Sequence, residues 1–421
     1  MKIRLFILLF LSMISVQLEA QLVLSGEIRP RYEFRNGYRH LPDHDTWPAH
    51  LISQRTRLNV AWKSKGVSSA IRFQDVRIWG DEAMKKDVAG VGLYEGWVEV
   101  RVFDSLYIKA GRQELVYDNQ RLFSNNNWSQ KAVTHDALSM RFQRAGWHWD
   151  GAIAFNQSRD TTFSTDYASS IGNYKALYMS ILSRKMGSFR ISALSAGDSW
   201  QKKGTLNTQY LRLTHGLMLQ YTGKVFQSAL RGFYQSGRSE SGMPVDAYYA
   251  SLDITASPDK HWQLGAGAEY QSGQDSSVQG ASLVRYFTCL YGSGHSFNGS
   301  LDYFTKASDT KNTGLFDAFL NLRYKGPETL SLSLTLHSFL NTGKYPDRNS
   351  GGLMPNFLAL EANCSLHWLA RKDMELQAGY SFLQGSQTLA TLAGGNQAHT
   401  AHWTYVMLTY RPVFLEWTPS R

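Results

Sequence analysis

The sequence has little of what marks soluble multidomain proteins or helical membrane proteins. After the first twenty residues there is no stretch of 18 consecutive apolar residues, so no further membrane-spanning helix is expected. Only two cysteines are present, Cys289 and Cys364, too few for a disulfide framework, and we expect both to be unpaired thiols. The ten prolines and 35 glycines form no flexible linker, which favours one large domain within the 421 residues.

Charge is also sparse, whereas aromatic residues are abundant. Charged residues make up 19% of the chain, below the usual fraction of about 25%, and Phe, Trp and Tyr together make up 13%. The formal net charge is +10, yet no run of Lys and Arg is longer than a pair. A nucleic-acid-binding protein usually concentrates its basic residues, so we expect no nucleic-acid partner. The excess of positive charge instead favours a basic surface that faces acidic solutes or polymers.

The first twenty residues, MKIRLFILLFLSMISVQLEA, have the pattern of a secretory signal peptide. Lys2 and Arg4 precede an apolar segment at residues 5–16 that is too short to span a bilayer, and Ala20 ends an approximate cleavage site. The pattern predicts cleavage after residue 20 and a mature domain over residues 21–421. An exported chain without a further spanning helix can cross a membrane only as a barrel.

Alternation of apolar and polar residues is the strongest signal in the rest of the chain. From Leu22, LVLSGEIRPRYEF places apolar residues on one face and Glu27, Arg29 and Arg31 on the other. LSLSLTLHSF, from Leu330, alternates Leu with Ser, Thr and His in the same way. This period of two predicts strands with one apolar face and one polar face.

The connections between these strands alternate in length. Along the chain, short turns alternate with long polar loops. The turns include residues 63–66, 144–146 and 371–373, and the loops include residues 35–50 and 116–135. The pattern predicts an all-β fold, a transmembrane antiparallel β-barrel of about 18 strands with short periplasmic turns and long extracellular loops. A soluble all-β protein is the alternative, but its exposed face would be richer in Lys and Glu. Residues 281–304 form either a hairpin or an elaborated loop, which leaves 20 or 18 strands. Near the C-terminus, residues 403–414 are expected to form the last strand, and its end is left open because LEWTPSR follows.

The segment GRQELVYDNQRLFSNNNWSQ, residues 111–130, follows a predicted strand and is unusually polar. If Leu106, Ile108 and Ala110 face lipid and the strand ends at Gly111, this segment can fold inward over the pore. The guanidinium group of an arginine binds carboxylates through paired hydrogen bonds, and an aromatic ring can stack on a sugar. Alternatively, the arginines pair with Glu114, Asp118 or Asp136 and hold the loop.

The same segment carries a resemblance to a known family. Residues 111–142 resemble the central motif of the alginate-export family of outer-membrane barrels through Gly111, Arg112, Gln113, Asp118, Arg121, Leu122, Asn125, Trp128, Asp136 and Ala137. Residues 54–62, 73–82 and 290–304 agree as well. The resemblance implies an 18-stranded barrel with an arginine-rich, electropositive pore, which in the founding members conducts a polyuronate out of the cell.

We therefore expect an outer-membrane channel of a Gram-negative bacterium for diffusion or export of anionic saccharides or related small solutes. The alternatives are a general porin without saccharide preference and an adhesin or assembly barrel that acts through its loops. Outer-membrane lipid and the barrel-assembly machinery are expected partners, and no cofactor is expected. The residues expected to line the pore or bind the solute are Arg29, Arg31, Arg55, Arg57, Arg112, Arg121, Arg141, Asp118, Asp136, Asn125 and Trp128.

Two other groupings of polar residues could suggest a metal site or an active site. The first long loop holds His40, Asp43, His44, Asp45 and His50, but the spacing matches no metal motif, and no metal site is expected. An active site at the barrel rim would draw on His135, Asp136 and Ser139. Adjacent residues of a strand point to opposite faces, so His135 and Asp136 should not converge, and we expect no enzyme activity.

Overall fold

The computed structural model describes residues 20–82, 90–163, 174–202, 204–205, 208–277, 280, 282–327, 329–347 and 350–419. The predicted signal peptide therefore lies outside the described residues except for Ala20. The elements are β1 (Gln21–Asn36), β2 (Ala49–Ser64), β3 (Val67–Ile78), β4 (Gly92–Phe103), β5 (Leu106–Gln113), β6 (His135–Arg144), β7 (Trp147–Phe155), β8 (Ala176–Met186), β9 (Phe189–Gln201), β10 (Gln209–Thr222), β11 (Phe226–Gly237), β12 (Ala247–Ala256), β13 (Trp262–Gln271), the short 3₁₀ helix η1 (Ala307–Thr310), β14 (Leu315–Lys325), β15 (Leu330–Leu340), β16 (Phe357–Arg371), β17 (Met374–Gly385), the helix α2 (Gln387–Ala393), β18 (Ala401–Tyr410) and β19 (Val413–Trp417).

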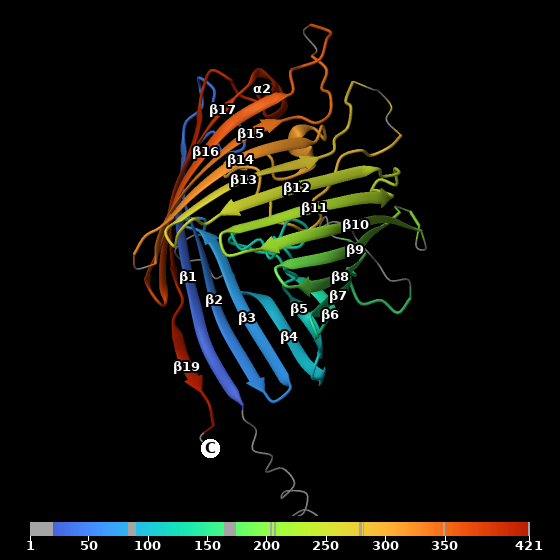
Figure 1. Ribbon diagram of the computed structural model, residues 1–421, viewed down its shortest axis with the longest axis vertical. Coiled ribbons are helices and arrows are strands. Elements are labelled where there is room, and N and C mark those ends of the chain that lie inside the picture. The colour runs from blue at the N-terminus through green and yellow to red at the C-terminus, as the bar shows by residue number, and fades with distance from the viewer. Residues whose placement is uncertain are drawn as a thin grey trace, which may run out of the picture.

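The strands form one antiparallel sheet that closes on itself (Figure 1). Each strand pairs with its neighbours in sequence, and β1 pairs with β2 on one edge and with β18 and β19 on the other. The last two elements are one strand interrupted at Arg411 and Pro412. Proline has no N–H to donate to the ladder, but the carbonyl oxygen of Pro412 accepts from the N–H of Gly26 at 2.9 Å. The fold is therefore a closed barrel of 18 strands, as predicted, whose last strand runs past Phe414 to Trp417.

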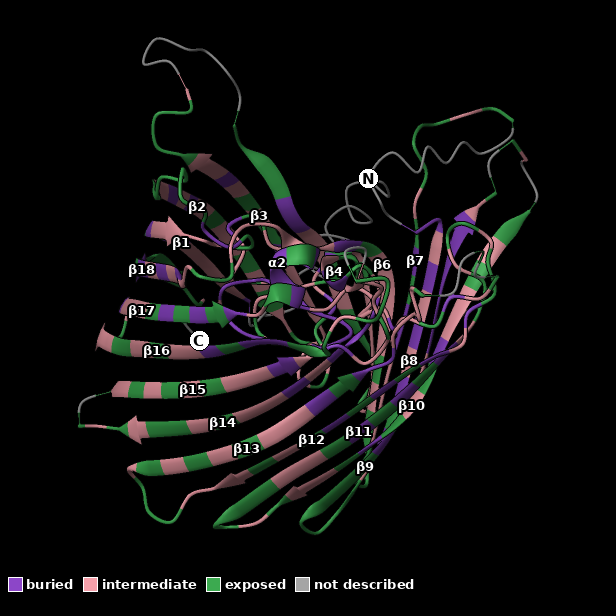
Figure 2. Ribbon diagram, turned by 90° about the horizontal axis from the view of Figure 1, so that it is seen from above, coloured by how far each residue is buried: buried purple, intermediate pink, exposed green. Residues whose placement is uncertain are grey.

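Along each strand, side chains point alternately to the membrane and to the interior of the barrel. On β1, Ile28 is 44% exposed on the outer face, whereas Arg29 is only 2% exposed because it points inward. The outer face of β15 carries Leu332, Leu334 and Leu336 in the same manner, and Figure 2 shows the banding along the strands. An apolar outer face is what a barrel in lipid requires. Separately, none of the helices in the described ranges is long and apolar enough to cross a bilayer.

The two ends of the barrel differ in the length of their connections. At one end, the turn end, two to five residues join successive strands, and at the other, the loop end, the connections have 7 to 43 residues. In outer-membrane barrels the short turns are periplasmic and the long loops extracellular. The longest loop covers residues 272–314, and no strand occurs among its described residues, so residues 282–304 form an elaborated loop rather than a hairpin.

The interior of the loop half is packed with apolar side chains. Inward-facing Leu177, Met179 and Ile181 of β8 are buried beneath residues of the long loops, including Phe123 and Phe287. A second cluster, which contains Leu301, Phe304, Leu358, Leu389 and Trp403, lies under α2 and β14–β18. In this half of the barrel, the interior is therefore not lined by polar rows alone. Loops that fold into a barrel bury apolar anchors, and these need an apolar inner wall to pack against.

Candidate functional site

Two loops from the loop end fold into the lumen and meet there. We call residues 114–134 the first inward loop and residues 272–314 the second. They join through an isolated bridge between Phe123 and Tyr291, where the N–H of Tyr291 donates to the carbonyl oxygen of Leu122 at 3.0 Å. Gly292 allows this contact, because a Cβ at that position would lie 1.9 Å from the carbonyl oxygen of Arg121. The two loops therefore act as one obstruction across the lumen.

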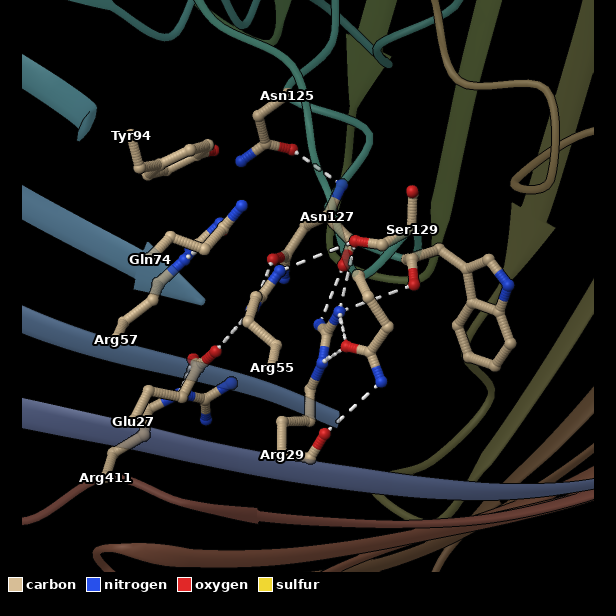
Figure 3. Close-up of polar contacts among 12 residues, drawn as sticks. Glu27, Arg29, Arg55, Arg57, Gln74, Tyr94, Asn125, Asn127, Ser129 and Arg411 are labelled. Atoms are coloured by element: carbon tan, nitrogen blue, oxygen red, sulfur yellow. Dashed lines mark hydrogen bonds and ion pairs between the residues drawn. The ribbon is translucent and has the colours of Figure 1, made fainter. Parts of the chain in front are cut away.

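Arginines of the first two strands fix the first inward loop (Figure 3). Arg29 donates to the carbonyl oxygens of Asn127 at 2.7 Å and Ser129 at 3.1 Å, and to the side chain of Gln130 at 2.8 Å. Arg55, which is fully buried, donates to the side-chain oxygen of Asn127 at 2.9 Å. These residues were predicted to line the pore, and the structure places them inside the barrel as anchors of the loop.

Arg29 and Arg55 lie directly opposite each other in the register of β1 and β2, an arrangement that costs energy for like charges. Glu27 offsets part of this repulsion through its ion pair with Arg55 at 2.5 Å. Glu27 also accepts from Arg411 at 3.0 Å, and Arg411 reaches Glu375 of β17 at 2.9 Å. The network therefore ties β1 and β2 to the last strands and reinforces the seam of the barrel.

Both ring faces of Trp128 are occupied. The imidazole of His295 stacks on the ring with 4.2 Å between centroids and 11° between planes, and the guanidinium carbon of Arg31 lies 4.3 Å from the ring centroid. Trp403 and Tyr405 contact it edge-on. A sugar has no free face of Trp128 to stack on, in contrast to the role expected from the sequence.

Arg121 lies in a buried contact between the two inward loops and the barrel wall. Its guanidinium group donates to Glu269 of β13 and, at 2.5 Å, to the side-chain oxygen of Asn298. Burial alone would lower the pKa of Arg121, but Glu269 beside it raises that pKa above its ordinary value. Burial also raises the pKa of the Cys289 thiol to about 11, so the thiol stays protonated. Cys289 and Cys364 are both free, as predicted.

Arg112 and Asp136 lie on the outer face of the barrel, not in the pore. The ladder of β5 continues through Gln113, and Arg112 shares the outward row of Leu106, Ile108 and Ala110. Its partner across the ladder is Asp136, 3.9 Å away, with 60% of the Asp136 side chain exposed. The expectation failed because the strand was assumed to end at Gly111.

The remaining predicted residues divide between the loop and the wall of the lumen. Asp118 accepts from Arg231 of β11 at 2.5 Å, and Asn125 donates to Glu114 at 3.1 Å, so both hold the first inward loop. On the wall, the guanidinium carbon of Arg57 lies 3.7 Å from the ring centroid of Tyr94. Arg141 reaches Glu99 at 3.4 Å and remains 46% exposed. Two further basic residues share this wall: Lys109, as expected from its place in the alternation of its strand, lies over Trp97, and Arg72, which sequence reasoning missed, lies beside Glu95.

A basic cleft of about 970 Å³ opens on the loop side of the inward loops. We call it the vestibule. Six basic side chains line it against three acidic ones. Glu33 and Asp302 are sealed, with 1% and 4% of their side chains exposed, whereas Arg35 and Arg39 are 31% and 60% exposed. Lys131 and Lys306, also at its surface, were not predicted, because they lie in loops where no strand alternation marks them.

Asp302 of the second inward loop joins that loop to the loop of residues 37–48 at the edge of the vestibule. It accepts from His295 at 2.7 Å, from Arg39 at 2.9 Å and from the hydroxyl of Tyr38. Burial alone would raise the pKa of Asp302, but the hydrogen bonds from His295, Tyr38 and Arg39 lower it to about 2. Asp302 is therefore ionised at any physiological pH and holds the loops together.

A second cleft of about 460 Å³ lies on the turn side and is lined by hydroxyl, amide and charged groups of β12–β18. His295 lines both clefts, so the stack of His295 on Trp128 stands where the two spaces adjoin.

Neither of the two other groupings of polar residues forms a site. In the described part of the chain no three His, Cys, Asp or Glu side chains are placed to hold a metal ion. His44 pairs with Asp45 in solvent, while His50 bonds to Tyr32. His135 faces inward against Tyr174, and Asp136 faces outward, so they do not converge.

Comparison with known proteins agrees with this architecture. The family model described as alginate export matches residues 20–385. The chain belongs to the alginate export family. The family that the sequence suggested is thereby confirmed. A comparison with curated proteins found no match.

Solved outer-membrane proteins share the fold of this alginate-export family barrel. The outer membrane protein OpdK of Pseudomonas aeruginosa superposes with a TM-score of 0.61 at 10% identity, covering 94% of this chain and 99% of OpdK. The structure of OpdK with vanillate superposes with a TM-score of 0.60 at 11% identity, covering 95% of this chain and 99% of OpdK. OccAB2 of Acinetobacter baumannii superposes with a TM-score of 0.58 at 12% identity, covering 94% of this chain and 98% of OccAB2. At these identities the likeness concerns the fold alone. Together with the family, it makes this chain an outer-membrane barrel of the porin type.

Proposed function

We propose that this barrel is a passive channel for small anionic solutes, uronates and other carboxylates among them. The observation that carries the proposal is the asymmetry of the vestibule. Two of its three carboxylates, Glu33 and Asp302, are covered by guanidinium groups and one, Asp81, is exposed, so the charges that a solute meets are mainly those of Arg35, Arg39, Lys131 and Lys306. Fixed positive charge at a pore mouth raises the local concentration of anions and favours their entry.

The turn-side wall extends this basic surface beyond the inward loops. Arg57, Lys109 and Arg141 each lie against an aromatic ring, which holds the cation in place, and Arg141 remains 46% exposed although it pairs with Glu99. The attraction at each position stays weak, as conduction requires, because solutes have to leave as well as enter. One relative by fold, OpdK, was solved with vanillate, an aromatic carboxylate, and this agrees with an anionic solute for the present channel.

The structure gives less support to a preference for saccharides than to a preference for anions. A saccharide site needs an open aromatic face, and Trp128 has none because His295 and Arg31 cover it. Carboxylate charge, rather than the sugar ring, is therefore the proposed basis of selection.

Uptake into proteoliposomes tests this proposal. Galacturonate should enter several times faster than galactose, which has the same ring without the charge. Changing Arg39 and Lys131 to Gln should remove most of that difference, whereas Arg112→Gln should leave it intact because Arg112 lies outside the barrel. Equal rates for both sugars in the unaltered protein would refute anion selection.

A further inference from the structure

Two arginines of the vestibule share one tyrosine ring. Arg35 lies at the end of β1, and Arg39 lies in the loop of residues 37–48 that follows it. The guanidinium carbon of Arg35 lies 4.4 Å from the ring centroid of Tyr38, and that of Arg39 lies 5.4 Å from the same centroid. The two positive charges are therefore held near one point, where they repel each other unless anions offset them.

Contacts with the second inward loop and the barrel wall fix this arrangement. The hydroxyl of Tyr38 donates to Asp302, and its ring centroid lies 5.6 Å from that of Trp403. Arg39 has a φ of +65°, in the left-handed region that residues other than glycine rarely adopt. Its N–H donates to the carbonyl oxygen of Leu301 at 3.1 Å, which holds the backbone in this costly conformation. The side chain of Arg39 consequently starts from a fixed position beside Tyr38.

The ion pairs of the two arginines use only part of each guanidinium group. Arg35 donates to Glu33 through Nε at 3.0 Å and through Nη2 at 2.8 Å. Arg39 donates to Asp302 through Nη2 at 2.9 Å. Among the residues that the structure describes, neither arginine has an ion pair with a second carboxylate. A guanidinium group has five N–H donors, so each arginine retains donors for a carboxylate that enters from the vestibule.

The rest of the vestibule adds positive charge and an apolar wall. Six basic side chains line it against three acidic ones, and Leu51, Val76 and Ile78 line the same cleft. In a cleft of net positive charge, the attraction energy of a dianion is about twice that of a monoanion. The apolar side chains suit a carbon chain that joins two charged ends.

We propose that Arg35 and Arg39 form a two-point site for solutes that carry two carboxylates, one on each guanidinium group. The inference rests on the proposed function, because it assigns a class of anion to the vestibule that selects anions. A dicarboxylate forms charge-assisted hydrogen bonds at both arginines, whereas a monocarboxylate forms them at one. Its second charge also offsets the repulsion between the two arginines more completely.

Block of the chloride current through single barrels tests the two-point site. Succinate and butyrate have carbon chains of the same length, but succinate has a second carboxylate. Succinate should block at a concentration at least about tenfold lower than butyrate. Arg39→Lys keeps the charge and a donor for Asp302 but loses the planar fork, so it should remove most of that difference. Arg77→Lys is the matched control, because Arg77 lines the same vestibule but pairs with Asp75, and it should preserve the difference.

The possible outcomes separate this site from the proposed function. Equal block by succinate and butyrate in the unaltered protein, with an anion-selective current, would overturn the two-point site and leave the proposed function standing. A current without anion selectivity would refute both. Sulfate that blocks as well as succinate would overturn the site in favour of charge alone. A preference for succinate that survives Arg39→Lys would overturn the role of Arg39.

Discussion

Arg31 touches Trp128 in two ways, with its guanidinium group over the indole ring at 4.3 Å and with a hydrogen bond to the Trp128 carbonyl oxygen at 2.8 Å. The first strand of the barrel thereby sets the position of the loop that narrows the lumen. Arg29, two residues earlier on the same face, holds the next part of that loop. The width of the channel and the closure of the barrel consequently depend on the same row of β1.

Arg29→Met should release the first inward loop. The change removes five donor contacts to the loop and leaves the carbonyl oxygen of Asn127 without its guanidinium partner, at a cost of about 2–4 kcal/mol to loop docking. We expect larger and noisier single-channel currents in a planar bilayer.

Arg141→Met is the matched control for Arg29→Met. It removes an arginine from the same lumen, but Arg141 contacts Glu99 and Tyr107 of the wall rather than the loop. The single-channel currents of Arg141→Met should show no more noise than those of the unaltered protein. Quiet currents of unchanged size in Arg29→Met would contradict the anchoring role of Arg29.

Gly292→Ala should separate the two inward loops. The added Cβ would lie 1.9 Å from the carbonyl oxygen of Arg121, so the backbones have to move apart at a cost of about 1–3 kcal/mol. Limited proteolysis should then cut residues 114–134 faster. Gly232→Ala is the control, since a Cβ there would meet no atom within 4 Å. Equal cleavage in both variants would show that the junction does not restrain the loops.

Strand alternation was enough to predict the barrel, its long loops and the inward row of β1. Glu27, Arg29 and Arg31 alternate with apolar residues, and this order alone decides which side chains point inward. The same rule places Arg112, two residues after Ala110, on the outer face. It also places Asp136, two residues before Leu138, on that face. The mistake lay in where the strand was assumed to end.

Partners that join distant loops could not be predicted from the sequence. Arg121 pairs with Glu269, which is 148 residues away, and His295 meets Trp128 only because both loops fold into the lumen. Periodicity describes single strands and carries no information on such contacts. The packing of the inward loops also explains the apolar inner wall of β8, which the general pattern of polar interiors did not predict.

Acid should loosen the vestibule through Asp302. Its pKa is lowered in the folded protein from 3.8 to about 2, so its stabilisation is complete above pH 3.8 and is lost as the pH falls through 2. The shift corresponds to about 2 kcal/mol. Current noise should therefore be constant from pH 7 to about pH 4 and rise below it.

Asp302→Asn should show raised current noise already at neutral pH, because the amide cannot pair with Arg39 and His295 as a carboxylate does. Noise in the unaltered protein that rises near pH 6 would point to a different titrating group and contradict the role of Asp302.

Arg411→Ala should weaken the seam of the barrel. The side chain joins Glu27 of the first strand to Glu375 of β17, and its loss leaves two carboxylates close together, which we expect to cost about 1–3 kcal/mol. The urea midpoint, followed by tryptophan fluorescence, should fall. Arg371→Ala removes an exposed ion pair with Asp373 at a neighbouring turn and should change the midpoint little. Equal midpoints for the two variants would mean that the seam does not depend on Arg411.

The most direct test of the central claim is the reversal potential of a single barrel in a planar bilayer under a potassium chloride gradient. The exposed cations of the vestibule predict an anion-selective potential that moves toward zero when Arg39, Lys131 and Lys306 are changed to Gln together. A potential near zero or of cation-selective sign in the unaltered protein would contradict the account.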